Sequence, residues 1–157
     1  MENFLKTVTN PLKLKLFFLT KLPLALIAGL KVVSANNLSA VVSVKYGYLT
    51  QNPFKSMYFA CMAMAAELST GVLVLNAVQE SGKNISTLVT GLEAQFVKKG
   101  VGVIKFECLN GDDVQNAINL AIQTNESQEI KTESIGYNIE GQIVSKFTIF
   151  WSVKCKN

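Results

Sequence analysis

The stretch QNPFKSMYFACMAMAAELSTG, Gln51 to Gly71, decides how this sequence is interpreted. Apolar residues occupy most of its positions, which predicts one long helix that is buried on nearly every side. A single carboxylate, Glu67, lies within it. Burial of a carboxylate costs free energy unless the group is paired, hydrogen-bonded or protonated, so Glu67 needs a structural or a chemical reason.

We expect this helix to extend over about residues 53–78. Asn52 is a natural N-cap residue, and Pro53 suits the first turn because the amide that proline lacks would have no partner there. The apolar pattern continues to Val78, and the sequence ESGKN then ends the helix.

Helices are predicted before this segment, over residues 1–22 and 23–29. Lysines followed by an apolar run also give this region the outline of a secretory signal. Lys21 and Pro23 interrupt the run, which favours helices packed on the domain, and no apolar run reaches the ~18 residues of a membrane span.

Strands account for most of the remaining sequence. The runs LKVVSA and LSAVVSVKYGYL, separated by NN, predict an antiparallel hairpin before the long helix. Four more strands follow that helix, the last two turning near Glu140 and Gly141. A short helix over GDDVQNAINLAIQTN interrupts them, with Asp112 or Asp113 as its predicted cap.

Composition excludes several classes of function. The 157 residues suit one domain, 1–157, and the net charge of +4 comes from scattered lysines rather than a basic cluster, so we expect no nucleic-acid partner. The chain has no histidine, which excludes Ser-His-Asp and Cys-His catalysis and histidine-containing metal sites. Its three cysteines are far apart and indicate reduced thiols in the cytoplasm.

The elements together indicate an α+β fold. One mainly antiparallel sheet can bury the apolar sides of one helix if it curves round that helix, and one face of the helix is then left for a partner. This is the hot-dog fold, here with extra N-terminal helices.

Three segments also resemble an uncharacterised thioesterase-like family of the hot-dog superfamily: VKYGYLTQNPFKSMYFACMAMAAELSTG, FVKKGVGVIKFEC and GQIVSKFTIFWSVK. The resemblance extends from about Leu30 to Lys154. Relatives of known activity, the phenylacetyl-CoA and 4-hydroxybenzoyl-CoA thioesterases, have an HGG-type motif at the start of this helix and an acid about two and a half turns later. Glu67 falls on that acid, whereas Tyr58, Phe59 and Ala60 replace the HGG motif.

The resemblance implies that Glu67 is a general base or nucleophile. It also implies that a backbone amide at Phe59 or Ala60 polarises the thioester carbonyl, usually across a dimer interface. An amide needs no particular side chain, but side chains here crowd an approach that glycine leaves open.

Substrate-binding candidates surround this helix: Asn52, Ser56, Tyr58, Ala63, Thr70, Lys98 and Lys99. The lysines suit the phosphates of coenzyme A, or protect a strand edge from aggregation. Small residues beside Glu67 form a groove for a ligand or for a second helix. Each polar candidate also has a structural alternative. Asn52 can cap the helix, and the hydroxyls of Ser56 and Thr70 can bond to their own backbone instead of a ligand.

We therefore predict a cytoplasmic hydrolase of acyl-CoA or related acyl thioesters. A homodimer is expected and a homotetramer remains open. We expect no metal and no cofactor apart from the coenzyme A of the substrate. The alternative is a non-catalytic acyl-ligand binding protein. A dehydratase-like function is weaker, because those sites usually pair a histidine with an acid.

Overall fold

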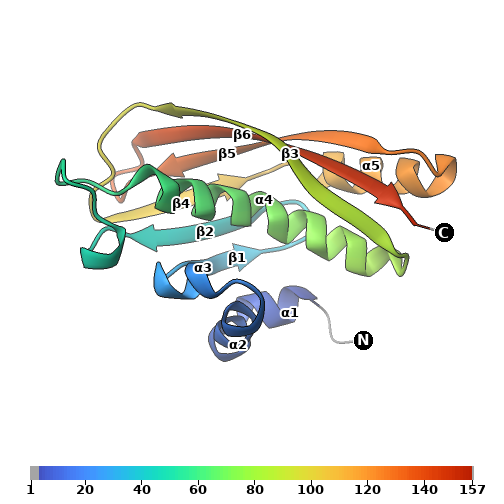
Figure 1. Cartoon of the computed structure of the whole chain (residues 1–157), viewed down its shortest axis with the longest axis horizontal. Helices are drawn as coiled ribbons and strands as arrows, with labels where there is room; N and C mark the ends of the chain where they lie inside the picture. Colours follow the sequence, from blue (N-terminus) through green and yellow to red (C-terminus); the bar gives the residue numbers. More distant parts are fainter. Residues whose placement is uncertain (1–3, 157) are drawn as a thin grey trace.

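The computed structural model describes residues 4–156 (Figure 1). Helices α1 (Phe4–Thr9), α2 (Pro11–Lys21) and α3 (Pro23–Ile27) precede the strands β1 (Lys31–Ala35) and β2 (Ala40–Lys45). A 3-10 turn, η1 (Tyr48–Thr50), leads to the long helix α4 (Phe59–Ser81). The remaining elements are β3 (Ile85–Phe96), β4 (Val103–Cys108), α5 (Gly111–Thr124), β5 (Gln128–Tyr137) and β6 (Ile143–Cys155).

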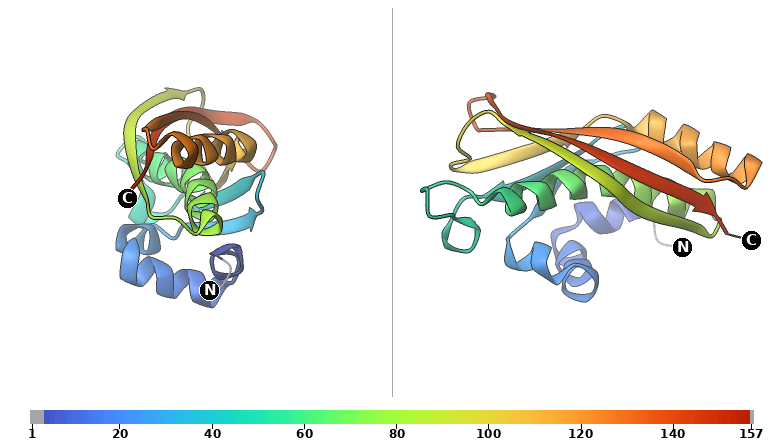
Figure 2. Two further views of the ribbon diagram at one scale, coloured as in Figure 1. Left: turned by 90° about the vertical axis from the view of Figure 1, so that its right-hand side faces the viewer. Right: turned by 45° about the horizontal axis from the view of Figure 1, so that its top comes forward.

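The six strands form one antiparallel sheet in the order β1-β2-β4-β5-β6-β3, and it curves round α4 as predicted (Figures 1 and 2). Thirteen of the 23 residues of α4 are buried. By length and composition α4 could cross a membrane, the only such helix found in residues 4–156, but its burial is that of a core helix.

Alternation along β6 directs one row of side chains at α4. Ser145, Phe147, Ile149, Trp151 and Val153 are all buried, at the spacing of two residues that places side chains on one face of a strand. The predicted hairpin of β1 and β2 and the turn before β6 are also present. These elements could be predicted because a half-buried strand has a period of two in its own sequence.

The predicted start of the long helix is wrong. It begins at Phe59, with Tyr58 as an N-cap that makes no side-chain bond. The Asn52 side-chain oxygen instead accepts hydrogen bonds from the amides of Phe54 at 2.9 Å and Ser56 at 3.3 Å, and its Nδ2 donates to the carbonyl of Met57 at 3.1 Å. Asn52 therefore stabilises a tight turn, because asparagine serves turns and caps by the same kind of bond.

Two other local predictions also need correction. The N-terminal segment is broken at Asn10, whose side chain accepts bonds from the amides of Leu12 and Lys13 and caps α2. Helix α5 has Asn110 as its N-cap, and Asp112 and Asp113 lie in its first turn instead. Both carboxylates still stabilise the helix, because negative charge near its N-terminus interacts favourably with the helix dipole.

Helices α1 to α3 form a separate layer beside β1 and α4 (Figures 1 and 2). Val8, Leu14 and Phe18 anchor this layer in the core. The N-terminal helices therefore pack on the domain, as predicted, and they cover part of the face of α4 that the sheet leaves open.

Candidate functional site

Glu67 lies in the first half of α4, about two turns after its start, on the side that faces the N-terminal helices. It borders a pocket of about 280 Å³. The rest of the lining is mainly apolar and comes from the segment around the start of α3, from the residue before β1 and from α4: Lys21, Leu22, Pro23, Leu24, Ala25, Leu30, Met64 and Leu68. The carboxylate also lies over Gly71, where an added Cβ would be 3.4 Å from its Oε1. Among the described residues that line this mainly apolar pocket, Glu67 is the only acidic one and Lys21 the only basic one.

Burial raises the pKa of Glu67 above the usual range of a glutamate. Within residues 4–156, no hydrogen bond or ion pair reaches its carboxylate. No buried side-chain oxygen among the described residues lacks a hydrogen-bond partner, so the Glu67 oxygens reach solvent at the pocket. A partly buried carboxylate that has a raised pKa and is open to the pocket is available for acid–base chemistry.

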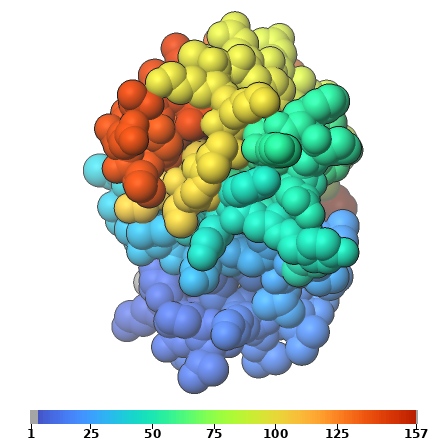
Figure 3. All heavy atoms as spheres, turned by 90° about the vertical axis from the view of Figure 1, so that its left-hand side faces the viewer, coloured from blue at the N-terminus to red at the C-terminus, as the bar shows by residue number. Residues whose placement is uncertain are grey.

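A second pocket, of about 530 Å³, lies at the N-terminal end of α4. Figure 3 shows this end of the molecule, where the loop before α4 and the segment near residue 100 lie side by side. Six of the predicted site residues line it: Asn52, Ser56, Tyr58, Phe59, Lys98 and Lys99. The structure thus brings together residues that are separated by about forty positions in the sequence.

Aromatic rings shape this pocket. The rings of Tyr58 and Phe59 are 4.9 Å apart, Phe59 contacts Phe96 at 6.4 Å, and Phe96 continues to the buried Phe147 at 5.7 Å. Phe96 and Met57, both in the lining, were missed by sequence reasoning. Only the position of Phe96 beside Lys98 along the chain hinted at a shared site.

The first turn of α4 has two unused backbone donors. The amides of Cys61 and Met62 donate to the carbonyl of Tyr58 at 3.0 and 3.5 Å. The amides of Phe59 and Ala60 meet no acceptor among the described residues. Free amides at the positive end of a long helix dipole are suited to an oxyanion.

The predicted lysines lie at the border of the same pocket. The Lys99 Nζ donates to the carbonyl of Phe54 at 3.1 Å, and the Lys98 Nζ donates to the Gln142 side-chain oxygen at 2.8 Å. Both acceptors are neutral, so each lysine keeps its positive charge uncompensated by these contacts.

The other candidates are held by local bonds. Ser56 Oγ donates to the Asn52 side chain at 3.2 Å. Thr70 Oγ1 donates to the carbonyl of Glu67 at 2.9 Å and accepts from Trp151 Nε1 at 3.0 Å. Ala63 is half-buried on α4. Substrate contacts of these three residues stay a prediction.

Glu67 and Phe59 do not meet within one chain. Eight residues of helix separate them, which corresponds to a rise of about 12 Å, and they line different pockets. A site that uses both groups on one substrate therefore needs a second copy of the chain.

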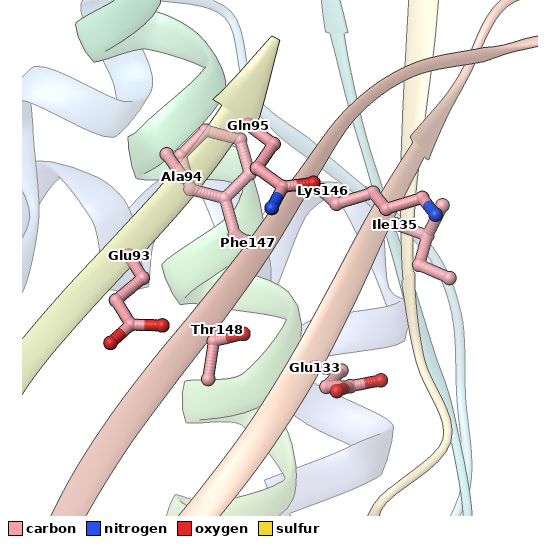
Figure 4. Close-up of a pocket in the computed structure, with 8 residues that line it drawn as sticks. All are labelled: Glu93, Ala94, Gln95, Glu133, Ile135, Lys146, Phe147 and Thr148. Carbon is pink, nitrogen blue, oxygen red and sulfur yellow. The ribbon is translucent and has the colours of Figure 1, made fainter. Parts of the chain in front are cut away.

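Another pocket, of about 360 Å³, lies over the strands β3, β5 and β6 (Figure 4). The carboxylates of Glu93 and Glu133 lie on either side of Thr148 there. None of the predicted site residues lines this pocket, and it is exposed on the side of the sheet away from α4.

Comparisons with known proteins agree with this architecture. The model of a family described as a domain of unknown function, DUF4442, matches residues 13–153. A search of curated proteins finds no match. Among solved structures, a probable thioesterase of unknown function from Pseudomonas aeruginosa, PA5026, has 18% identity and a TM-score of 0.78, over 96% of this chain and 99% of that one.

Two further structures show the same fold. A protein of unknown function from Chlorobaculum tepidum has 18% identity and a TM-score of 0.78, over 97% of this chain and 99% of that one. The thioesterase HI1161 from Haemophilus influenzae has 15% identity and a TM-score of 0.64, over 89% and 88%. The chain has the hot-dog fold of these thioesterase-like proteins, and it belongs to the DUF4442 family.

Proposed function

We propose that this protein hydrolyses acyl thioesters, with acyl-CoA esters as the principal substrates and Glu67 as the catalytic carboxylate. The observation that carries the proposal is the state of Glu67: a partly buried carboxylate with a raised pKa and no bonded partner in the described chain. The thioesterase names of structures with the same fold support it. The cytoplasmic location stays a prediction.

The chemistry needs a base close to neutral pH. A raised pKa makes Glu67 a stronger base than a surface glutamate, so it can take a proton from water as the water oxygen attacks the thioester carbon. The tetrahedral intermediate then collapses, the C–S bond breaks, and the thiolate leaves with a proton from Glu67. If Glu67 attacks the carbon itself, the C–S bond breaks, the thiolate leaves and takes a proton from solvent, and a mixed anhydride with Glu67 remains. Water then hydrolyses this anhydride, which releases the acid and restores the carboxylate.

The oxyanion would be bound by the amides of Phe59 or Ala60 from a second copy of the chain. One chain keeps these amides about 12 Å from Glu67 along α4, so a dimer is the simplest way to join them. Strand β3 supports this assembly, because its 12 residues form an edge of the sheet and Leu88, Leu92 and Phe96 are exposed on it. Long exposed edges of this kind are usually paired or protected.

The assembly gives a direct prediction. Light scattering at micromolar concentration should show twice the chain mass of 17.1 kDa, or four times that mass if a tetramer forms. The Tm should also rise with protein concentration, because association stabilises the folded state by mass action. A monomer at these concentrations would leave Glu67 without its proposed oxyanion donors.

The function is tested with a panel of acyl-CoA esters and the same acyl groups on N-acetylcysteamine, followed by release of free thiol. The wild type should release thiol from both series. Lys98→Gln with Lys99→Gln should raise KM for CoA esters only, and ~0.5 M salt should reduce the difference because exposed charges are screened. Lys131→Gln with Lys154→Gln, equal in charge and away from this pocket, is the control.

One observation favours a non-catalytic binding protein instead. The Phe59 ring, packed against Tyr58, borders the pocket at a position where the resemblance would put a glycine. Tight binding of acyl-CoA without thiol release from any member of the panel would support that alternative.

A further inference from the structure

Helix α2 is apolar on two opposite faces, and only one of them packs on the protein. Leu14 and Phe18 lie in the core, with 6% and 1% of their surface exposed. Leu12, Leu16 and Leu19 form a stripe on the other side, with 80%, 62% and 61% exposed. The spacing of four and three residues places these leucines on one face of the helix, which we call the outer leucine face.

Basic side chains flank this face. At 100° per residue, Lys13 lies on one side of the stripe and Lys15 on the other, and Lys21 ends the helix. The neighbouring helix α3 adds two exposed apolar side chains, Leu24 and Ile27. An apolar stripe between lysines is the pattern of a helix that lies in the plane of a membrane surface.

Charge over a longer segment points to the same partner. Between residues 4 and 66 the sequence has seven lysines and no acidic residue, and Glu67 is the first carboxylate after that segment. Four of these lysines, Lys6, Lys13, Lys15 and Lys21, lie on α1 and α2. Lysines near an anionic bilayer each add to the attraction, and no carboxylate of residues 4–66 opposes it. Figure 2 shows the N-terminal helices as the outermost layer on their side of the molecule, where α2 can reach a flat surface.

We propose that α2 and α3 form a membrane-binding surface that lays the outer leucine face on an anionic lipid bilayer. Lys21, Leu22 and Leu24 of this surface also line the Glu67 pocket. The surface would therefore place the opening of that pocket beside the bilayer, where amphiphilic acyl compounds concentrate. Binding to the bilayer itself does not depend on hydrolysis, so the two proposals can fail separately.

The test uses the full chain and sedimentation with vesicles of phosphatidylcholine alone or with ~30% phosphatidylglycerol. Wild-type protein should bind the anionic vesicles, bind neutral ones more weakly, and be released at ~0.5 M salt. Leu12→Gln, Leu16→Gln and Leu19→Gln together should lower partitioning by about tenfold or more, because three apolar anchors are lost. Glutamine is a good helix former, so α2 should persist.

The matched control removes three exposed leucines elsewhere: Leu38→Gln, Leu109→Gln and Leu120→Gln. This variant should bind vesicles like the wild type. Lack of wild-type binding to anionic vesicles, or equal losses in both variants, would overturn the proposal. Unchanged vesicle binding by the α2 variant would also overturn it. So would a lower assembly mass of that variant together with no lipid binding by the wild type, because a second copy of the chain would then cover the outer leucine face.

Discussion

Replacing Glu67 by glutamine should reduce kcat for thioester hydrolysis by about 10²–10⁴-fold, the usual effect of losing one general base. Glutamine is nearly isosteric but cannot take a proton from water or attack the acyl carbon. The fold and ligand binding should persist, because no hydrogen bond or ion pair within residues 4–156 depends on this carboxylate. Steady-state kinetics and titration with a non-hydrolysable acyl-CoA analogue measure the two effects.

The matched control is Glu80→Gln, the same change at an exposed carboxylate on the same helix. It should leave kcat within about twofold of wild type. Hydrolysis at the wild-type rate by the Glu67 variant would rule out a catalytic role for this residue.

The wild-type rate should rise with pH over a range above that of an ordinary glutamate, because burial raises the pKa of Glu67.

The same raised pKa has an effect on stability. In the folded state the charged form of Glu67 is disfavoured, so at neutral pH it reduces the free energy of unfolding. Below the ordinary pKa of glutamate the group is protonated in both states, and this penalty disappears. Glu67→Gln should therefore raise the Tm at neutral pH. This gain should fall towards zero as the pH is lowered from the raised pKa of the folded state to the ordinary pKa of glutamate in the unfolded state.

Replacing Gly111 by alanine should lower the Tm by about 10 °C or more. A Cβ on Gly111 would lie 2.5 Å from the Leu38 Cα and 2.7 Å from its carbonyl carbon, and closer still to the carbonyl oxygen of Asn37. These are backbone atoms of the turn between β1 and β2. The Gly111 amide also donates a hydrogen bond to the Leu38 carbonyl in this turn. The turn and the start of α5 would have to separate.

Thermal unfolding followed by circular dichroism measures this effect. Gly47→Ala is the control, because a Cβ there meets nothing within 4 Å and the backbone is extended. Its Tm should change by no more than a few degrees. A Gly111→Ala variant as stable as the wild type would mean that the β1–β2 turn does not depend on this close contact.

Much of the fold could be predicted because its strands have local signals. The alternation along β6 and the turn at Gly141 identify this strand without knowledge of its neighbours. Glu67 could be singled out for a similar reason, since one carboxylate in an apolar helix is visible in the sequence. The start of α4 could not be predicted, because Asn52 followed by Pro53 fits a turn as well as a cap.

The pockets depend on contacts that no local pattern contains. Lys99 contacts Phe54 although 45 positions separate them in the sequence. Residues of α3 lie beside Glu67 because the N-terminal layer packs on the domain. The spacing between Phe59 and Glu67 was known from the sequence, but only the structure shows that their pockets are separate.

The place of β3 in the sheet has a consequence for the order of folding. Although β4 follows it along the chain, β3 pairs with β6, so that Ile85 meets Cys155 and Phe96 meets Ser145. Such distant pairing closes a long loop before its contacts stabilise it, which slows folding. Until β6 forms, α4 lacks its cover by Trp151 and β3 has no partner, so the half-folded chain exposes an apolar helix and an open edge together. These are the two features that promote aggregation, and chaperone capture at this stage would protect both.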